Sequence, residues 1–216
     1  MDKSKYYNGL KKLARTQRAS FSICGPTRTK TEIKDIFKHY GVSVDLWPMA
    51  GMNRSKLKNL RGAYINDGQN AHVMISRNLP DEQQIFTMAH ELKHHLVDSD
   101  EISGFCHTSN NLDVIEIGAE IFAAEFIYPE QDFISDLEEM GVNKGECTAS
   151  DLVKLKHEKR ASLSYSSLSK RAEFTGLAES GSMPKVGWKK LETEIYGEPD
   201  YIRIQRYRKQ KQRMHG

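Results

Sequence analysis

The spacing of apolar residues predicts two helices and then a strand at the start of the chain. Residues 4–19 are typical of a short basic helix. Residues 29–40 carry apolar side chains at a helical period, and Gly41 follows as a stop. Residues 42–47 alternate between apolar and polar positions, which predicts a strand that ends before Pro48.

Two further strand-like runs predict a β-hairpin in front of a long helix. They cover residues 62–65 and 72–76, and the residues between them read Asn-Asp-Gly-Gln-Asn, a typical hairpin loop. A helix over residues 81–97 follows directly after Pro80, with acidic residues in its first turn.

A very apolar helix is predicted over residues 113–128, where Pro129 ends it. The pattern indicates three more helices, over residues 130–140, 148–159 and 164–174. The chain then becomes polar, and we interpret residues 180–216 as a partly disordered tail. Its aromatic residues indicate that part of it docks on the rest of the protein; they are Trp188, Tyr196, Tyr201 and Tyr207.

Composition favours a cytoplasmic protein over a membrane or secreted one. Hydrophobic residues make up 38% of the 216 residues and charged residues 28%, which suffices for a core and is too polar for a membrane protein. No stretch approaches the ~18 consecutive apolar residues of a membrane span. The charged N-terminus does not resemble a secretory signal. Cysteines are odd in number and far apart, which argues against a disulfide framework.

Charge is distributed unevenly along the chain. Residues 1–40 carry +7, residues 41–184 carry −9 and residues 185–216 carry +5. An acidic body between basic ends favours an electronegative site. Solvated surface is the simpler interpretation of the ends, and binding of nucleic acid or a partner is the alternative.

The motif that carries chemistry is His-Glu-Leu-Lys-His at residues 90–94. Residues four apart share a helix face, so His90 and His94 direct their imidazoles at one point and suit two corners of a zinc site. Glu91 lies about 100° around the helix, where it reaches a metal-bound water without being a ligand. Leu92 is expected to anchor the helix to the core. This composition gives such a motif by chance only about 0.02 times, although two solvated surface histidines remain the alternative.

A third metal ligand is predicted on the helix over residues 113–128. At about 100° per residue, Asp113, Glu116 and Glu120 form one stripe flanked by apolar positions, whereas Glu125 lies opposite. Such carboxylates are costly unless a cation meets them, and zinc is such a cation. We therefore expect Glu116 as the third ligand and Glu120 as an acceptor for the outer nitrogen of a ligand histidine. A stripe that faces solvent is the alternative.

Three other residues compete as ligands: His95, Cys106 and His107. His95 follows His94 directly and therefore points elsewhere on the helix. The other two lie in a predicted polar loop, and we interpret all three as bystanders.

Two blocks of the sequence resemble the ImmA/IrrE family of metallopeptidases. The first reads Gln-Ile-Phe-Thr-Met-Ala-His-Glu-Leu-Lys-His over residues 84–94. The second reads Glu-Ile-Gly-Ala-Glu-Ile-Phe-Ala-Ala-Glu-Phe-Ile-Tyr-Pro over residues 116–129. The resemblance covers about residues 30–175. It implies an α+β fold with a minimal zincin-like peptidase core, made of a small sheet, a zinc helix and a glutamate helix.

The resemblance also implies the roles of four residues. His90, His94 and Glu116 match the metal ligands, with Zn²⁺ as the cofactor, and Glu91 matches the catalytic base.

Two positions depart from the family pattern. Lys93 stands where most members carry glycine, and its helix angle predicts that it is solvated. Glu120 replaces the usual asparagine, which leaves the choice of ligand open.

Residues 152–177 resemble the small helical module that often follows this peptidase core. Part of it is like the second half of a helix-turn-helix, in which Lys170 and Arg171 could touch phosphate. We expect the module to pack on the peptidase or on a protein partner more than on DNA. Four segments are predicted: an N-terminal basic helical segment, a zincin-like core, a helical module and a basic tail, over residues 1–28, 29–145, 146–179 and 180–216.

The predicted function is zinc-dependent hydrolysis of a peptide bond in a specific intracellular protein. Glu91 is expected to act as the general base, and an edge strand over residues 72–76 to hold extended substrate. Tyr64 and His107 are the candidates for stabilising the oxyanion. Because members of the family often cleave a repressor of phage, mobile-element or stress genes, the resemblance implies a helix-turn-helix repressor as the substrate.

Two other functions are open at this point. One is a transcription regulator with a structural or sensory zinc and basic ends on DNA. The other is the toxin or effector half of a gene pair. The free glutamate in the metal-binding helix favours the enzyme, because a structural site has no need of it.

Overall fold

The computed structural model describes residues 2–47, 61–99 and 109–198, without the side chains of residues 109–112. Within these ranges eight helices accompany a three-stranded sheet, which confirms a mixed α and β fold. In chain order the elements are α1 (Lys3–Ser20), α2 (Lys30–His39), β1 (Ser43–Trp47), β2 (Gly62–Asn66), β3 (Ala71–Ser76), α3 (Asp81–Val97), α4 (Ser109–Ile127), α5 (Glu130–Glu139), α6 (Ala149–Lys159), α7 (Tyr165–Phe174) and α8 (Trp188–Tyr196).

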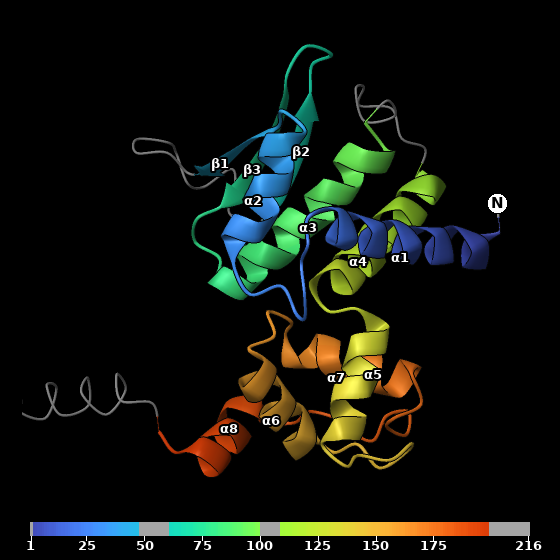
Figure 1. The fold of residues 1–216 in the computed structure, drawn as a ribbon, viewed down its shortest axis with the longest axis vertical. Helices are drawn as coiled ribbons and strands as arrows, with labels where there is room; N and C mark the ends of the chain where they lie inside the picture. Colours follow the sequence, from blue (N-terminus) through green and yellow to red (C-terminus); the bar gives the residue numbers. More distant parts are fainter. Residues whose placement is uncertain (1, 48–60, 100–108, 199–216) are drawn as a thin grey trace, which may run out of the picture.

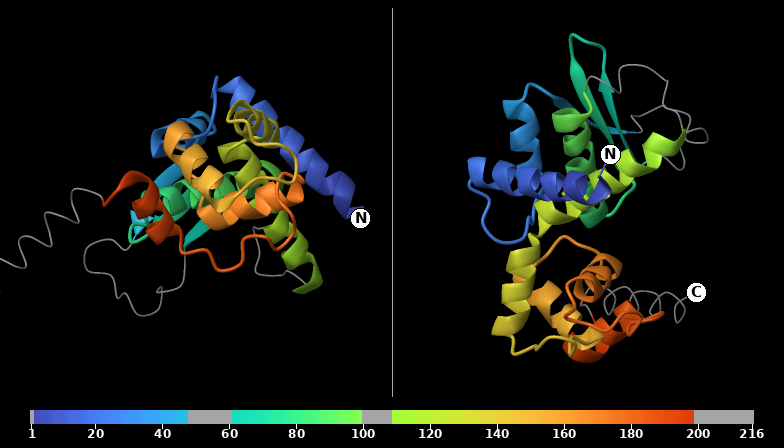
Figure 2. Two further views of the ribbon diagram at one scale, coloured as in Figure 1. Left: turned by 90° about the horizontal axis from the view of Figure 1, so that it is seen from below. Right: turned by 90° about the vertical axis from the view of Figure 1, so that its right-hand side faces the viewer.

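The elements are arranged in two halves that α4 and α5 connect (Figure 1). The sheet and helices α1–α4 form the first half, and helices α5–α8 form the second. The right-hand view of Figure 2 shows from a further side how the chain passes from α4 into α5 between the halves. One cluster of buried apolar side chains nevertheless extends from Leu10 in α1 to Ala172 in α7, so the halves share a core.

β3 is the central strand of the sheet, whose order is β1-β3-β2. β1 pairs parallel with β3, and β2 pairs antiparallel with it, which confirms the predicted hairpin. The prediction of an edge strand over residues 72–76 is wrong, because β1 pairs with the side of β3 that β2 leaves free. The edge strand β2 of the described sheet packs against α3.

Helix α3 is anchored through its apolar face. Leu92 is fully buried, as predicted, together with Ala89 and the nearly buried Ile85. α2 adds its periodic apolar residues to the same core; these are Ile33, Ile36 and Phe37. Because α3 is packed along its length, the side chains on its remaining face have fixed positions.

α1 crosses α4 at a distance that leaves no room for a side chain. A Cβ added at Gly118 would lie 2.8 Å from Cδ1 of Leu10 and 3.0 Å from Cε1 of Tyr6. Ala14 of α1 is also fully buried. The predicted basic helix α1 therefore packs against α4 through its apolar face.

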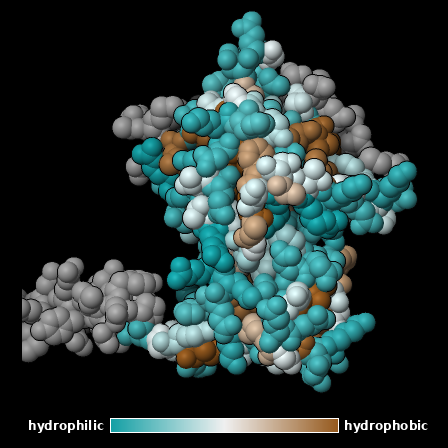
Figure 3. Space-filling model, in the orientation of Figure 1, coloured by the Kyte–Doolittle hydropathy of each residue, from teal (hydrophilic) through white to brown (hydrophobic). Residues whose placement is uncertain are grey.

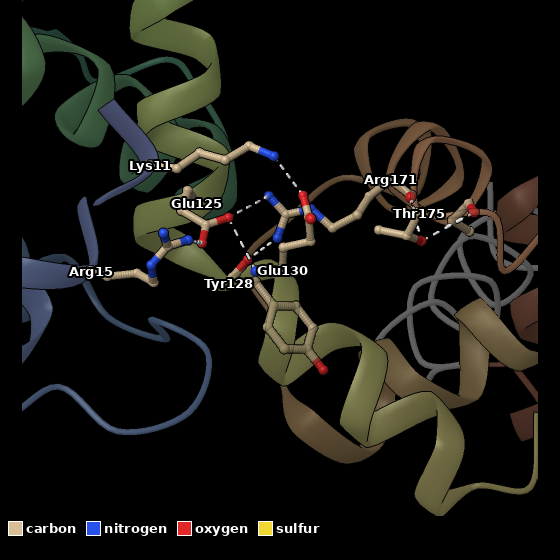
Figure 4. A network of polar contacts seen from close by, with 8 residues as sticks. Lys11, Arg15, Glu125, Tyr128, Glu130, Arg171 and Thr175 are labelled. Carbon is tan, nitrogen blue, oxygen red and sulfur yellow. Dashed lines mark hydrogen bonds and ion pairs between the residues drawn. The ribbon is translucent and has the colours of Figure 1, made fainter. Parts of the chain in front are cut away.

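A buried carboxylate joins the two halves. Glu125 of α4 is fully buried, and its oxygens lie 2.7 Å from Arg15 of α1 and 3.8 Å from Arg171 of α7 (Figure 4). Arg171 also donates to the carbonyl of Tyr128, and the backbone N–H of Glu130 donates to Glu125 at 3.1 Å. Of the two residues that could touch phosphate, Arg171 is not available, because its side chain is only 9% exposed and is engaged within the protein.

Part of the predicted tail forms the ordered helix α8. The ring of Trp188 stacks on Tyr165 at 4.9 Å, and that of Tyr196 stacks on His157 at 3.9 Å. Docking is thus confirmed for two of the tail's aromatic residues, and residues 188–196 are helical. The described residues do not include Tyr201 and Tyr207.

The face of the molecule shown in Figure 3 is predominantly polar. On the face shown in Figure 3, hydrophobic residues form small separate patches among hydrophilic ones. None of the helices in the described ranges has the length and apolar character needed to cross a membrane.

Candidate metal centre

Two imidazoles of α3 point at one location, as their spacing predicts. Nε2 of His90 and Nε2 of His94 lie 3.1 Å apart, and the ring centroids are 4.9 Å apart in an edge-on arrangement. The two side chains are 18% and 6% exposed. The pair is therefore largely shielded from solvent yet accessible on one side.

Glu116 of α4 brings a carboxylate to the same location. Its Oε2 lies 3.1 Å from Nε2 of His90, and its Oε1 lies 3.7 Å from Nε2 of His94. The hydrogen bond from His90 holds the pKa of Glu116 below its usual value. A carboxylate that is ionised and close to two imidazoles is suited to bind a cation.

The three residues form a group that could hold a metal ion, since one donor atom from each lies within 4.8 Å of the others. Ligands at zinc-nitrogen distances are about 3.4 Å apart in a tetrahedron, and the observed nitrogen–nitrogen and nitrogen–oxygen distances of 3.1 to 3.7 Å bracket that value. The spacing of the donors is therefore close to that of ligands around a tetrahedral ion, with a different oxygen of Glu116 nearest to each histidine.

Glu91 lies beside this group, between α3 and the edge strand β2. It is only 6% exposed. Burial raises its pKa, an effect that the nearby His90 and His94 oppose and Glu116 reinforces. The backbone of Tyr64 hydrogen-bonds to its carboxylate. Glu91 is thus a buried acid that the main chain of β2 orients next to the metal centre.

Gly62 of β2 makes this arrangement sterically feasible. A Cβ at this position would lie 2.8 Å from Oε1 of Glu91 and 2.3 Å from Cγ2 of Thr87. Any other residue would therefore push β2 away from α3. The sequence pattern predicted the strand but not this contact, because the close approach depends on the packing of two elements.

The acceptor for the outer nitrogen of His94 is Asp98 and not Glu120. Nδ1 of His94 lies 2.7 Å from Oδ2 of Asp98, which is 3% exposed. Glu120 lies one turn after Glu116 on an exposed position of α4. Sequence reasoning missed Asp98 although the same four-residue spacing links it to His94.

Lys93 is fully buried, contrary to the prediction that it is solvated. Its Nζ lies 2.6 Å from Oδ2 of Asp98 and donates to the carbonyl of Ile115 at 3.2 Å. The prediction fails because the helix angle describes α3 alone, whereas α4 covers this side of α3.

The competing ligands do not join the group within the described residues. The hydroxyl of Tyr64 lies 3.0 Å from Nδ1 of His95, which places His95 in a separate contact with β2. The described residues do not include Cys106 and His107. The side-chain group of Tyr64 that could stabilise an oxyanion is this hydroxyl, and it is in contact with His95 in the structure.

An α+β fold that brings two histidines and a glutamate of neighbouring helices together beside a buried glutamate is of the metallopeptidase type. The chain belongs to the peptidase M78 family, described as the IrrE N-terminal-like domain, whose family model matches residues 33–173. This match confirms the resemblance to the ImmA/IrrE family. A comparison with curated proteins gave no match.

Proposed function

We propose that the chain is a zinc-dependent metalloendopeptidase in which His90, His94 and Glu116 hold the metal and Glu91 is the general base. The observation that carries this proposal is the convergence of the three donor atoms within 4.8 Å beside a separate, buried carboxylate. Two imidazole nitrogens and one carboxylate oxygen are typical ligands of catalytic zinc, which keeps its fourth position open.

Each residue has a distinct part in the proposed hydrolysis. Zinc held by these residues would polarise the scissile carbonyl and lower the pKa of a bound water toward about 7. Glu91 would take the proton of the attacking water, whose oxygen bonds to the carbonyl carbon, and deliver it to the amine nitrogen as the C–N bond breaks. The N–H of Tyr64 and the space at Gly62 keep the carboxylate oriented.

Strand β2 is the proposed docking edge for an extended substrate. It is an edge strand of the described sheet and lies against α3, whereas β3 is central. A substrate added in extended form beside β2 would run past Glu91. Hydrogen bonds between the main chains of β2 and the substrate would supply the affinity. Side-chain contacts outside this strand pairing would supply the specificity.

The proposed substrate is one specific intracellular protein, a helix-turn-helix repressor of a phage, mobile element or stress response. The resemblance to the ImmA/IrrE family supports this choice. Selectivity is consistent with the small patches of exposed apolar surface in Figure 3, which suit defined contacts better than general capture of unfolded chains.

The experiment is to incubate zinc-loaded protein with candidate repressors from its own genome and to analyse the products by mass spectrometry. We expect a single discrete cut in one repressor and little cleavage of unfolded casein. The Glu91→Gln variant is the control and should produce no cut. If the protein instead binds a defined DNA sequence independently of Glu91 and cleaves no repressor, the peptidase proposal is wrong. The chain would then be a zinc-containing regulator.

A further inference from the structure

We propose that Asp98, held in place by the buried Lys93, is a positioning residue that fixes the tautomer and the orientation of His94 for metal binding. The inference rests on the proposed metal centre and adds two residues to it. Neither residue touches the group of His90, His94 and Glu116 as a ligand.

Hydrogen bonding at Nδ1 determines which nitrogen of His94 is available. An aspartate carboxylate accepts hydrogen bonds and does not donate them, so Nδ1 of His94 carries the proton in the 2.7 Å contact with Asp98. Nε2 then keeps its lone pair, and this is the nitrogen that lies 3.1 Å from His90 and 3.7 Å from Glu116. The contact with Asp98 therefore selects the tautomer that a metal requires.

Asp98 occupies a position that is unfavourable for a lone carboxylate. It caps the C-terminal end of α3, where the helix dipole repels negative charge, and it is almost fully buried. Nζ of Lys93 at 2.6 Å supplies the positive charge that compensates for both effects. Lys93 thereby holds the Asp98 carboxylate in place beside Nδ1 of His94.

Lys93 also connects the two helices that carry the ligands. Its Nζ donates to the carbonyl of Ile115, the residue that precedes Glu116 on α4. The same ammonium lies 5.8 Å from the ring centroid of Tyr6 on α1. One buried charge thus ties the ligand-bearing turn of α3 to the ligand-bearing turn of α4.

Stability alone does not account for this arrangement. A buried ion pair is often no more stabilising than well-packed apolar residues of the same size, because both charges lose their hydration. The pair is, however, bonded directly to a ligand imidazole, and residues that orient ligand histidines commonly contribute about 10- to 100-fold to metal affinity. Positioning therefore explains the placement of the pair better than stability does.

The test compares Asp98→Asn, Lys93→Met and the double variant with the wild type in three measurements. These are the ¹⁵N NMR tautomer of His94 in metal-free protein above about pH 7.5, the zinc dissociation constant by chelator competition, and the melting temperature of the metal-free protein. We expect Nδ1–H in the wild type, loss of this preference in Asp98→Asn, and about 10- to 100-fold weaker zinc binding. Asp81→Asn, an exposed acid at the other end of α3 that is paired with Lys30 far from His94, should match the wild type in the tautomer of His94 and in zinc affinity.

The double variant separates positioning from stability. It leaves no unpaired buried charge, so it should regain melting temperature relative to either single variant. If it also regains wild-type zinc affinity, the pair is only structural and the proposal is overturned. An Nε2–H tautomer of His94 in the metal-free wild type would overturn it as well. Failure of the wild type to bind zinc would instead contradict the proposed function, and the tautomer measurement would still decide the role of Asp98.

Discussion

Glu91 and Gly62 meet where α3 contacts β2, and each contributes a different property to the site. Glu91 supplies a buried carboxylate, and Gly62 leaves space for it because glycine has no side chain. Their effects can be separated from metal binding, because neither residue belongs to the convergent group of three donors.

Replacement of Glu91 by glutamine should abolish turnover while the protein keeps its zinc and its melting temperature. Glutamine has the same shape but cannot accept a proton from water, and loss of general-base catalysis typically costs about 10²- to 10⁴-fold. Zinc content by mass spectrometry and cleavage rate are the measurements. Glu82→Gln, an exposed acid on the same helix, is the matched control. Loss of zinc from Glu91→Gln would show that Glu91 is itself a ligand.

Gly62→Ala should impair catalysis and leave zinc binding nearly intact. The added Cβ would meet Oε1 of Glu91 at 2.8 Å and Cγ2 of Thr87 at 2.3 Å, so β2 and the carboxylate must move apart. We expect kcat to fall at least about tenfold and the free energy of unfolding to fall by about 1–3 kcal/mol.

The control is Gly9→Ala on α1, where an added Cβ meets nothing within 4 Å. This variant should keep full activity and gain about 0.5–1 kcal/mol in the free energy of unfolding. A Gly62→Ala protein with wild-type kcat would show that the close approach of β2 does not orient Glu91.

At the scale of elements, the sequence predicts local features and misses those that depend on packing. The convergence of His90 and His94 follows from helical periodicity, and the structure has this geometry. The central position of β3 depends on parallel pairing with the remote β1, which no local pattern encodes. Burial of Lys93 depends on how α4 covers α3. The contact of Asp98 with His94 could have been predicted from the sequence, because Asp98 follows His94 by one helical turn.

α7 is attached to α4 through Arg171, and this attachment should contribute strongly to stability. Arg171→Met removes one of the two arginines at the buried carboxylate of Glu125 and the donor to the carbonyl of Tyr128. Breaking such a buried pair should lower the free energy of unfolding by about 3 kcal/mol in urea denaturation. Lys170→Met, at the exposed neighbouring position, should change it by less than about 0.5 kcal/mol. Equal effects of the two substitutions would contradict the assigned role of Arg171.

At the scale of the whole molecule, the candidate metal centre lies in the first half, and the helices α5–α8 form the second half, below the first in the view of Figure 1. The four segment boundaries predicted from the sequence stay predictions. The contacts of α8 nevertheless show that the segment after residue 180 is not independent of the module before it, because Trp188 and Tyr196 stack on Tyr165 and His157.

Truncation after Ser180 should therefore leave a folded, zinc-binding protein of reduced stability. No residue of α8 is fully buried, so the core survives its loss. Two aromatic stacks at about 0.5–1.5 kcal/mol each predict a decrease of about 1–3 kcal/mol in the free energy of unfolding. Urea denaturation and zinc content are the measurements. An insoluble or zinc-free product would mean that α8 completes the core.

The most direct test of the metal centre is a crystal structure of the zinc-loaded protein with anomalous data at the zinc edge. We predict one anomalous peak within about 2.0–2.2 Å of Nε2 of His90, Nε2 of His94 and a carboxylate oxygen of Glu116. Glu91 should lie beside the ion without bonding to it. A peak coordinated by Glu120 in place of Glu116, or by Glu91, would contradict the assignment, and no peak at these histidines would contradict the zinc centre itself.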